Sequence, residues 1–429
     1  MARTGSALEG DGMTRRTRTR VFAVGVAALG LALAGCGGSN GSNGATGGDS
    51  AKTLTIGSIH PLSGALAGAG KLMDDAVKMA VDDINTNGGI KSLNGAKLEV
   101  DSGDSQGKPE TGQSEAQRLT TSGAVALVGT YQSDVTQNVA SVAERSKVPL
   151  VIDVAVDDAI LQQGYTYTFR IQPDATGMGT AGADSLAGLS QQAGAPVKTV
   201  SYIHIEGAFG DSVFKAFQKE AQAKGITVAK EVTYAGANFN DATTQVSQAA
   251  AAHPDAILVT GYYPDSLLIA KSIAALKPKV KAVYGIANGG FDDDQFPMDA
   301  GPAATGILSA NYHYDATSST VAEIRNRFQQ QYGHPMETAA VLSYQAVQVI
   351  AAGLEKSAST DPTKLRDAIA GVSIDKPLLA FDGPIEFDQT GQNKNATAVV
   401  MQIQSDKVEQ VYPDAFKTAT PKFPSSPAA

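Results

Sequence analysis

Residues 54–90 read LTIGSIHPLSGALAGAGKLMDDAVKMAVDDINTNGGI, and this stretch decides the fold class. It opens with a short apolar run, Leu54–Ile59, which is typical of a buried strand. A strand that is followed by an amphipathic helix is the repeating unit of parallel sheets covered by helices, so the stretch predicts an α/β protein. The residues that share one face at helical spacing are Met73, Val77, Ala80, Val81 and Ile84.

The same alternation continues along the chain and falls into two series. Two doubly wound parallel-sheet units in tandem are the simplest fold that fits both series. The first series adds predicted strands at Leu98–Asp101, Val125–Gly129 and Leu150–Val154, with helices near 111–121 and 135–145. The second series has predicted strands at Thr199–Ile205, Ile226–Val232, Ala256–Thr260 and Ala282–Ile286, with helices near 211–224, 240–252 and 264–276.

The last third of the chain has too few strands for a third sheet. It contains helical patterns at Val321–Tyr332, Thr338–Ser357 and Pro362–Gly371, and late strands at Ile385–Phe387 and Ala398–Gln404. We expect these elements to return and complete the first two units. Prolines are frequent after Tyr412, and we expect this tail to be disordered.

Charge and cysteine content narrow the function. The chain of 429 residues carries a formal net charge of -9, which argues against nucleic-acid binding because neutralising phosphates requires clustered Lys and Arg. It has a single cysteine, so a disulfide within the chain and a cysteine-rich metal site are both excluded.

The N-terminal residues have the pattern of an export signal. Arginines between positions 15 and 20 precede an apolar stretch, Val21–Ala34, that is too short to span a bilayer as a helix. It runs into Leu33-Ala34-Gly35-Cys36, which resembles the lipobox of bacterial lipoproteins, where the cysteine is lipidated. We therefore expect a signal peptide at 1–35 and a lipidated Cys36 with a flexible tether at 36–52, outside the cytoplasm. A plain secretory signal, twin-arginine export and a start at Met13 stay open here.

No constellation of residues in the sequence assembles catalytic or metal-binding chemistry. The five histidines show no i, i+4 pair, and Gly64–Leu72 departs from the spacing of a phosphate-binding loop. The run Asp292-Asp293-Asp294 lacks the alternate spacing of a calcium loop, which favours a solvated loop. We therefore expect a protein that is not an enzyme and that needs no cofactor or metal.

Polar and aromatic residues follow four predicted strands, at the ends where open α/β sheets bind ligands. Two of these ends carry the hydroxyl-rich turn with Tyr131 and Ser133, and the segment 155–158. The other two carry Tyr262 and Asn288. Two ends fall in each unit, which predicts a binding site in the cleft between the units. The alternatives are a helix N-cap at Ser133 and ordinary packing of the aromatic side chains.

The ordered motifs resemble the leucine/isoleucine/valine-binding family of type I solute-binding proteins, which serve ABC importers. The resemblance covers about Thr53 to Pro413. Ile56–Gly64 (IGSIHPLSG) resembles the opening strand and turn of the family, and Ala80–Ile90 (AVDDINTNGGI) is similar to its most recognisable signature. The remaining motifs in family order are Gly164-Tyr165, Phe169-Arg170, Phe209-Gly210 and Gly383–Gly391.

The resemblance implies two lobes that are joined by three crossovers and close on a ligand by a hinge. It implies that Ser133 receives the ligand carboxylate, that Tyr131 forms a wall, and that Ala155 offers backbone groups. It also implies that Tyr262, on the far lobe, seals the closed form. The expected boundaries are 53–171 plus 311–382 for lobe I, 172–310 plus 383–413 for lobe II, and 414–429 for the disordered tail.

Three departures from the family pattern concern the ligand. Val156 or Asp157 stands where the amino-acid binders of the family have a Thr, and Ala69 replaces an aromatic residue that covers the ligand. Asn288 is the nearest match to the acid that pairs the ligand ammonium. A buried ammonium requires a paired charge, so we expect Asp157 to supply it. Otherwise the ligand is a neutral amide, a urea-like, aromatic or polyol compound.

The resemblance therefore predicts a monomeric, lipid-anchored solute-binding protein. It would capture a small polar ligand, which is an amino acid or a related amide or aromatic compound, and deliver it to the permease subunits of an ABC importer. Two other interpretations stay open. A ligand-sensing lipoprotein would signal to a membrane kinase, and a cell-surface hydrolase would turn its ligand over.

Overall fold

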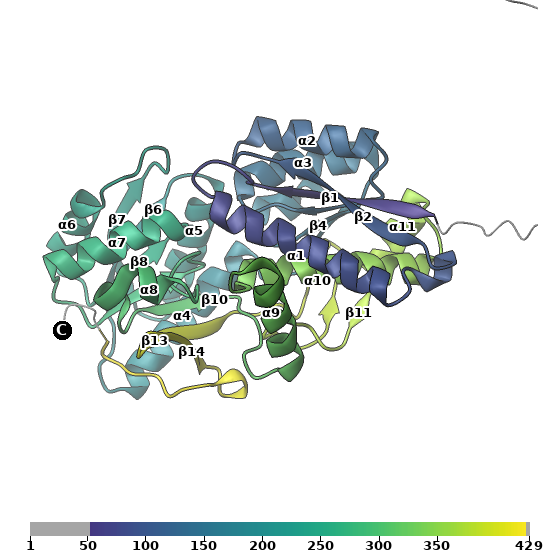
Figure 1. Cartoon of the computed structure of the whole chain (residues 1–429). Coiled ribbons are helices and arrows are strands. Elements are labelled where there is room, and N and C mark those ends of the chain that lie inside the picture. The colour runs from purple at the N-terminus through teal and green to yellow at the C-terminus, as the bar shows by residue number, and fades with distance from the viewer. Residues whose placement is uncertain (1–51, 426–429) are drawn as a thin grey trace, which may run out of the picture. The chain divides into compact units, whose positions relative to one another are not determined.

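The computed structural model describes residues 52–425 (Figure 1). The expected signal peptide, the lipidated Cys36 and most of the tether lie outside the described residues. Within 52–425, no helix is both long enough and apolar enough to cross a membrane. Two main β-sheets organise the described chain, and we call the parts built on them the first lobe and the second lobe.

The first lobe is built on a five-stranded sheet with the strand order β2-β1-β3-β4-β5. All neighbouring strands of this sheet run parallel, which confirms the first predicted unit. Its strands are β1 (Thr53–His60), β2 (Lys97–Asp104), β3 (Ala126–Gly129), β4 (Leu150–Ile152) and β5 (Thr168–Arg170). Its helices are α1 (Ala67–Thr86), α2 (Pro109–Thr121), α3 (Ser133–Ser146), α9 (Ser319–Tyr332), α10 (Thr338–Ser357) and α11 (Pro362–Ala370).

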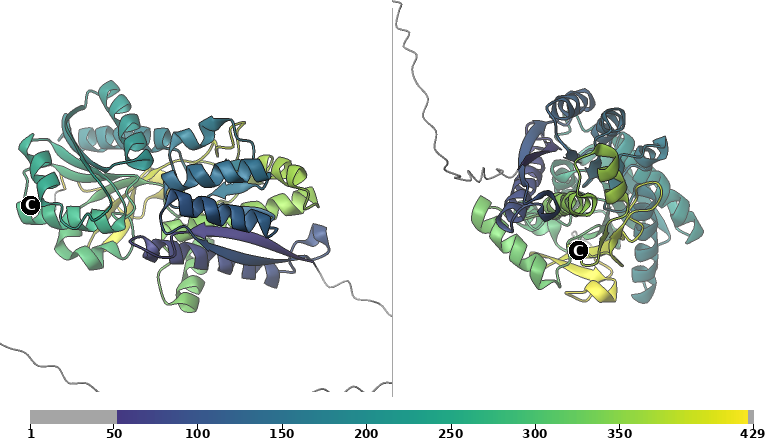
Figure 2. Two further views of the ribbon diagram at one scale, coloured as in Figure 1. Left: turned by 90° about the horizontal axis from the view of Figure 1, so that it is seen from above. Right: turned by 90° about the vertical axis from the view of Figure 1, so that its right-hand side faces the viewer.

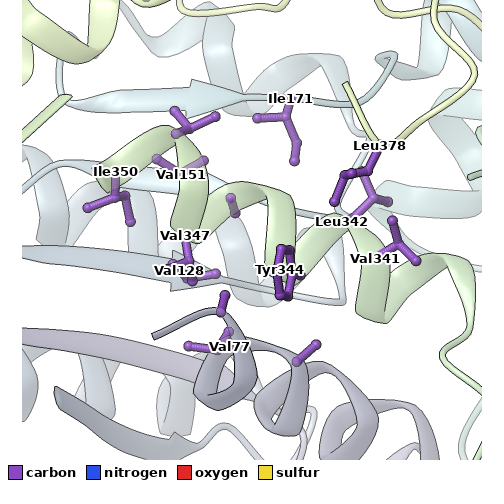
Figure 3. Close-up of a cluster of buried hydrophobic side chains, with 14 of the residues drawn as sticks. Val77, Val128, Val151, Ile171, Val341, Leu342, Tyr344, Val347, Ile350 and Leu378 are labelled. Atoms are coloured by element: carbon purple, nitrogen blue, oxygen red, sulfur yellow. The ribbon is translucent and has the colours of Figure 1, made fainter. Parts of the chain in front are cut away.

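Alternation along β3 explains why helices pack on both faces of this sheet (Figure 2). Val128 belongs to the cluster made with α1 and α10, which includes Val77, Val341 and Val347 (Figure 3). Its neighbour Leu127 belongs to the opposite cluster, which is made with α2 and α3. Successive side chains of a strand point to opposite faces of the sheet, so one short strand supplies both cores.

The segment Ala80–Ile90, which contains the end of α1, has a structural role in the first lobe. Asp83 accepts hydrogen bonds from Arg327 on α9 (2.7 Å) and from the Tyr344 hydroxyl on α10 (2.6 Å). Burial opposes the charged form of Asp83, but these bonds outweigh it and lower the pKa of the carboxyl group. Gly89 has a φ of 73°, and a Cβ there would lie 2.4 Å from the Ala96 carbonyl oxygen. The signature therefore fixes α1 against both returning helices.

The second lobe is built on a seven-stranded sheet with the order β14-β13-β10-β9-β8-β6-β7. Strands β6 to β10 run parallel, and β13 and β14 add an antiparallel edge, so the second predicted unit is confirmed. Its strands are β6 (Thr199–Ile205), β7 (Thr227–Tyr234), β8 (Ala256–Thr260), β9 (Ala282–Ile286), β10 (Leu308–Asn311), β13 (Val399–Gln404) and β14 (Lys407–Tyr412). Its helices are α4 (Ala175–Gln192), α5 (Ala208–Ala223), α6 (Thr243–Ala251), α7 (Tyr263–Leu276) and α8 (Phe296–Ala300).

Several elements go beyond the predicted series, among them β5, α4 and β10. The strands β5 and β10 have 3 and 4 residues, which is too short for an alternating pattern to show. Helix α4 reads ATGMGTAGADSLAGLSQQ, and its many small residues leave only a weak apolar stripe. The sequence pattern therefore does not predict these elements, because they are short or rich in small side chains.

The chain passes between the two sheets three times, after β5, after β10 and before β13. The short strands β11 (Ser373–Ile374) and β12 (Ile385–Glu386) pair with each other before the third passage. Ile385 is buried in the first-lobe core, and the Gly391 carbonyl accepts the N–H of Arg170 (2.8 Å). The third crossover therefore lies after Gly391, because residues 385–391 pack with the first lobe, and not at 383 as expected.

The expectation of a disordered tail is wrong for residues 414–425. Gln402 on β13 donates from Nε2 to the carbonyl of Lys422 (2.8 Å). The N–H of Ser425 donates to the Lys281 carbonyl (2.7 Å). Prolines lack the N–H donor, but the carbonyl oxygens of this segment remain. Side chains of the sheet donate hydrogen bonds to these carbonyl oxygens. Residues 426–429 lie outside the described part of the chain.

Candidate functional site

A cavity of about 310 Å³ lies between the two lobes, which is a suitable size for a small ligand. The first lobe contributes the start of α1, Tyr131 and the segment that enters α10. The second lobe contributes the start of α7 and the turn after β9, and the end of β10 completes the lining. The lining residues are Ala65, Leu66, Gly68, Ala69, Leu72, Tyr131, Tyr263, Pro264, Gly289, Asp292, Asp293, Gln295, Asp299, Asn311, Tyr312, His334, Pro335, Glu337, Thr338, Ala339 and Ala340.

Two tyrosines from opposite lobes meet beside this cavity. Tyr131 follows β3, and its ring centroid lies 5.3 Å from that of Tyr262, which precedes α7. Tyr262 also packs on Phe209, with 5.1 Å between the ring centroids. Asp265 accepts the N–H of Tyr262 (3.0 Å), which holds the tyrosine at the helix start. Burial raises the pKa of both tyrosines, so they present neutral hydroxyl groups.

Ser133 opens α3 but is not its N-cap, which is Gln132. The side chain is buried, and its Oγ accepts the N–H of Asp157 (3.3 Å). In the same turn the hydroxyl groups of Thr130 and Thr136 bond to each other (2.6 Å). The hydroxyl-rich turn thus satisfies much of its own hydrogen bonding, and Ser133 does not line the cavity.

The segment 155–157 stabilises its own loop. The Ala155 carbonyl accepts a hydrogen bond from Nε2 of Gln172 (2.8 Å). Asp157 accepts one from Nε2 of Gln137 (2.6 Å), and its other oxygen caps a short 3-10 turn. Neither Ala155 nor Asp157 lines the cavity. The acid that we expected to pair a ligand ammonium therefore caps a turn.

Asn288 shapes the turn that follows β9. Its side chain is fully buried, and its Oδ1 accepts hydrogen bonds from the Ser266 hydroxyl and from the N–H groups of Gly290 and Phe291, each at 3.0 Å. These three donors occupy the amide oxygen, so it is not presented to a ligand. The resulting turn places the next residue, Gly289, in the cavity lining.

Four acidic residues outside the predicted site line the cavity, and three of them are buried: Asp292 and Asp293 on the turn after β9, and Glu337 just before α10. The fourth, Asp299, has a lowered pKa because it accepts hydrogen bonds from Tyr263 and Gln295. Burial raises the pKa of Asp292 to about 8 and that of Asp293 to about 7. Burial also raises the pKa of Glu337 well above its usual range. Asp292 and Asp293 therefore do not form the solvated loop that we expected. The available signal was their position just beyond a strand end, where open sheets bind ligands.

The polar contacts of these acids come from neutral groups. Asp292 accepts a hydrogen bond from the side-chain amide of Asn311 (3.1 Å). Asp293 accepts the N–H of Gln295 (2.8 Å). In both cases a neutral donor stabilises the carboxyl group less than a cation would, so burial dominates and the pKa stays high.

Arg325 pairs with Asp294 and not with one of the three buried acids that line the cavity. Arg325 on α9 forms an ion pair with Asp294, and its guanidinium lies over the Tyr314 ring at 3.8 Å from the centroid. Glu337 accepts the N–H of Asp294 (3.0 Å), a contact that joins the lobes. Among the described residues that line the cavity, His334 alone can carry a positive charge.

A Ser–His–Asp arrangement in the first lobe is structural and not catalytic. Ser58 Oγ lies 3.0 Å from Nδ1 of His60, and Nε2 of His60 lies 2.8 Å from the Asp153 carboxylate. All three residues are fully buried, and Ser58 donates its hydroxyl proton to Asp74 (2.6 Å). A substrate cannot reach this serine. Within residues 52–425, no group of three or more His, Cys, Asp or Glu side chains is placed to hold a metal ion.

Comparisons with known proteins agree with this architecture. The profile of the periplasmic binding protein family matches residues 53–408. The Leu/Ile/Val-binding protein homolog 8 of Brucella abortus is 28% identical over 381 residues, covering 86% of this chain and 93% of its own. The leucine-binding protein LivK of Thermotoga maritima has a TM-score of 0.72 at 21% identity, covering 84% of this chain and 98% of its own. An ABC-transporter solute-binding protein of R. palustris in complex with benzoate has a TM-score of 0.73 at 20% identity, covering 87% and 97%.

Proposed function

Because this chain belongs to the periplasmic binding protein family, we propose that it is an extracytoplasmic solute-binding protein that delivers a small ligand to an ABC importer. The observation that carries this proposal is the cavity between the lobes, since both lobes line it and a ligand in it would contact both. The relatives support the class, because they are binding proteins, and this chain spans 93% of the length of the Brucella relative.

Ligand binding works through an equilibrium between open and closed lobes. Beside the cavity, the Asp134 carboxylate accepts the N–H of Ala208 at the start of α5 (3.2 Å), and Tyr131 packs on Tyr262. Opening the lobes breaks such contacts. A ligand that touches both walls binds the closed form more tightly than the open form, so it raises the closed population.

The lining favours a ligand with an apolar body. Leu66, Ala69 and Leu72 form an apolar wall at the start of α1, and Tyr131 adds an aromatic face. Ala69 is small. It therefore leaves room for a bulkier ligand group than an aromatic side chain at the same position would allow. This supports a branched aliphatic or an aromatic compound of the amino-acid, amide or aromatic classes.

Of the residues predicted from the sequence, we assign direct ligand contact to Tyr131, with Tyr262 acting by closing on it. The other four act by fixing the loops that frame the cavity, because their polar groups bond within their own lobe. These positioning residues are Ser133, Ala155, Asp157 and Asn288.

Cys36 is the proposed site of the lipid anchor that keeps the protein at the outer face of the cell membrane. Its place at the end of the signal-like stretch supports this assignment. Mass spectrometry of the membrane-extracted protein should find a lipid on an N-terminal Cys36, and Cys36→Ser should release the protein into the soluble fraction. A Cys36→Ser protein that stays in the membrane fraction contradicts the anchor.

The function is tested by thermal unfolding of the mature chain with amino acids, amides, aromatic acids and amines. A ligand at a hundred times its dissociation constant stabilises the folded state by about 2.7 kcal/mol, which raises the melting temperature measurably. Tyr131→Ala should remove most of that rise, whereas Tyr412→Ala, on the exposed face of β14, should leave it unchanged. If no compound shifts the melting temperature of a cooperatively folded protein, the proposal fails.

A further inference from the structure

We propose that the cavity selects an organic cation, with the protonated amine of the ligand between Asp293 and Glu337 and its apolar body against the wall formed by the start of α1. This assignment rests on the proposed function and specifies the charge of its ligand. It separates this chain from the R. palustris relative, whose benzoate is an anion.

The two carboxyl groups come from opposite lobes. Asp293 lies on the turn after β9 of the second lobe, and Glu337 precedes α10 of the first lobe. Closing the lobes therefore brings two acids toward one cavity, and their mutual repulsion raises the pKa of Glu337 in addition to burial. A cation between them turns that repulsion into attraction in the closed form, whereas an anion would add to it.

Two of the buried polar atoms that lack a partner in the described part of the chain belong to residues that line this cavity. Glu337 is only 7% exposed, and its Oε1 has no hydrogen-bond partner in the described part of the chain. The hydroxyl oxygen of Thr338, also 7% exposed, likewise has none there. A buried polar atom without a partner is unfavourable. An ammonium group has three N–H donors and no acceptor, so it can supply the donors that these oxygens lack.

The lining also distinguishes an organic amine from other ligands. Among the described lining residues there is no Lys or Arg, so a carboxylate would lack a strong ionic partner. Within residues 52–425 the acids are not grouped as ligands for a metal ion. Leu66, Ala69 and Leu72 also line the cavity, and burying an apolar body against them is favourable.

Matched compounds test the charge directly. Calorimetric titration should compare 3-methylbutylamine, 4-methylpentanoate and 4-methylpentanamide, which share one apolar body, and then 2-phenylethylamine with 3-phenylpropanoate. At least one amine should bind ten-fold or more tightly than its matched carboxylate. Carboxylates that bind as well as the amines overturn the cation assignment but leave the proposed function intact. Absence of amine binding also overturns the assignment, and the wider ligand panel then decides the function separately.

Two substitutions test the assigned residues. Asp293→Asn and Glu337→Gln should each weaken amine binding ten-fold or more and leave binding of any neutral amide within two-fold. The matched control is Glu323→Gln, which removes the same charge from an exposed position on α9. The glutamine at 337 keeps an acceptor for the Asp294 N–H, so the variant should fold, which its melting curve checks. Unchanged amine affinity in both cavity variants overturns the assignment.

Discussion

Buried acids in two regions of this protein have pKa values that are shifted in opposite directions. In the first lobe, Asp74 accepts hydrogen bonds from the hydroxyl groups of Ser58 (2.6 Å) and Ser102 (2.8 Å) and pairs with Lys78 (2.7 Å). Burial opposes its charged form, yet these partners lower its pKa. In the cavity, Asp292, Asp293 and Glu337 are also buried, and their pKa values are raised. Burial is common to both, so the difference lies in the partners: Asp74 pairs with a lysine, whereas Asp292 and Asp293 accept hydrogen bonds from neutral donors.

This difference distinguishes a carboxylate of the folded core from the carboxyl groups that line the cavity. A core that must stay folded supplies partners for its own carboxylates, as the first lobe does for Asp74. A binding site leaves its polar groups incompletely satisfied, so that a ligand can supply the missing partners. Buried acids that line a cavity between the lobes therefore support the proposed site.

The largest expected effect removes a satisfied acid. Asp74→Ala should lower the free energy of unfolding by about 3 kcal/mol, because it leaves two hydroxyl groups and a lysine without their shared partner. Glu337→Gln should leave the stability of the unliganded protein unchanged or raise it by about 1 kcal/mol, because burial disfavours the charged form of Glu337 and a glutamine carries no charge. Urea unfolding measures both. Equal losses in the two variants would erase the contrast between core and cavity.

The pH dependence of stability sharpens the same contrast. Between about pH 6.5 and 8 the folded state keeps protons on Asp292 and Asp293 that the unfolded state has lost. The free energy of unfolding of the unliganded protein should therefore fall as pH rises through this window, by about 2 kcal/mol. Burial lowers the pKa of His313 to about 4, so this group is largely neutral in both states near pH 7 and above.

Unfolding curves at pH 6.5, 7, 7.5, 8 and 8.5 measure this slope. The double variant Asp292→Asn with Asp293→Asn should reduce this slope, and adding Glu337→Gln should reduce it further, because burial also raises the pKa of Glu337. The lowered pKa of Asp74 acts at the acid end instead, where its stabilisation is lost as pH falls below the usual aspartate range. If the double variant keeps the wild-type slope of unfolding free energy against pH, then groups other than Asp292 and Asp293 cause that slope.

The smallest expected effect concerns the close approach of the lobes. A Cβ at Gly289 would lie 2.9 Å from the Tyr131 hydroxyl oxygen. Gly289→Ala should therefore push the lobes apart and weaken ligand binding several-fold, by about 1 kcal/mol. Gly188→Ala on α4 is the matched control, since a Cβ there meets nothing within 4 Å. It should leave affinity unchanged and add a few tenths of a kcal/mol to stability. Equal ligand affinity in both variants would show that closure of the lobes does not depend on the close approach of Gly289 and Tyr131.

Much of the fold was predictable because its signals are local. The apolar run Leu54–Ile59 and the helical face that follows lie within forty residues, and the same pattern recurs along both lobes. The predicted parallel units were right for this reason. Elements whose identity depends on distant partners, such as β10 and the segment after Pro413, carry little local signal. The Gln402 side chain that holds Lys422 cannot be inferred from the tail alone.

The site was only partly predictable. Strand ends pointed to loops that border the cavity, and the ring centroids of Tyr131 and Tyr262 lie 5.3 Å apart beside it. Which acid in such a loop faces the cavity depends on how the loop turns, and Asn288 turns its loop so that Asp292 and Asp293 line the cavity. Glu337 enters from a returning helix far along the chain, so no spacing within the strand-end motifs could reveal it.

A crystal structure with the tightest-binding amine tests the central claim most directly. The account predicts the ligand in the cavity between the lobes, with its nitrogen within about 3.2 Å of carboxylate oxygens of Asp293 and Glu337. Its apolar body should lie against Leu66 and Tyr131. A ligand seated instead against Ser133 and Ala155, with no contact to either acid, would contradict the account.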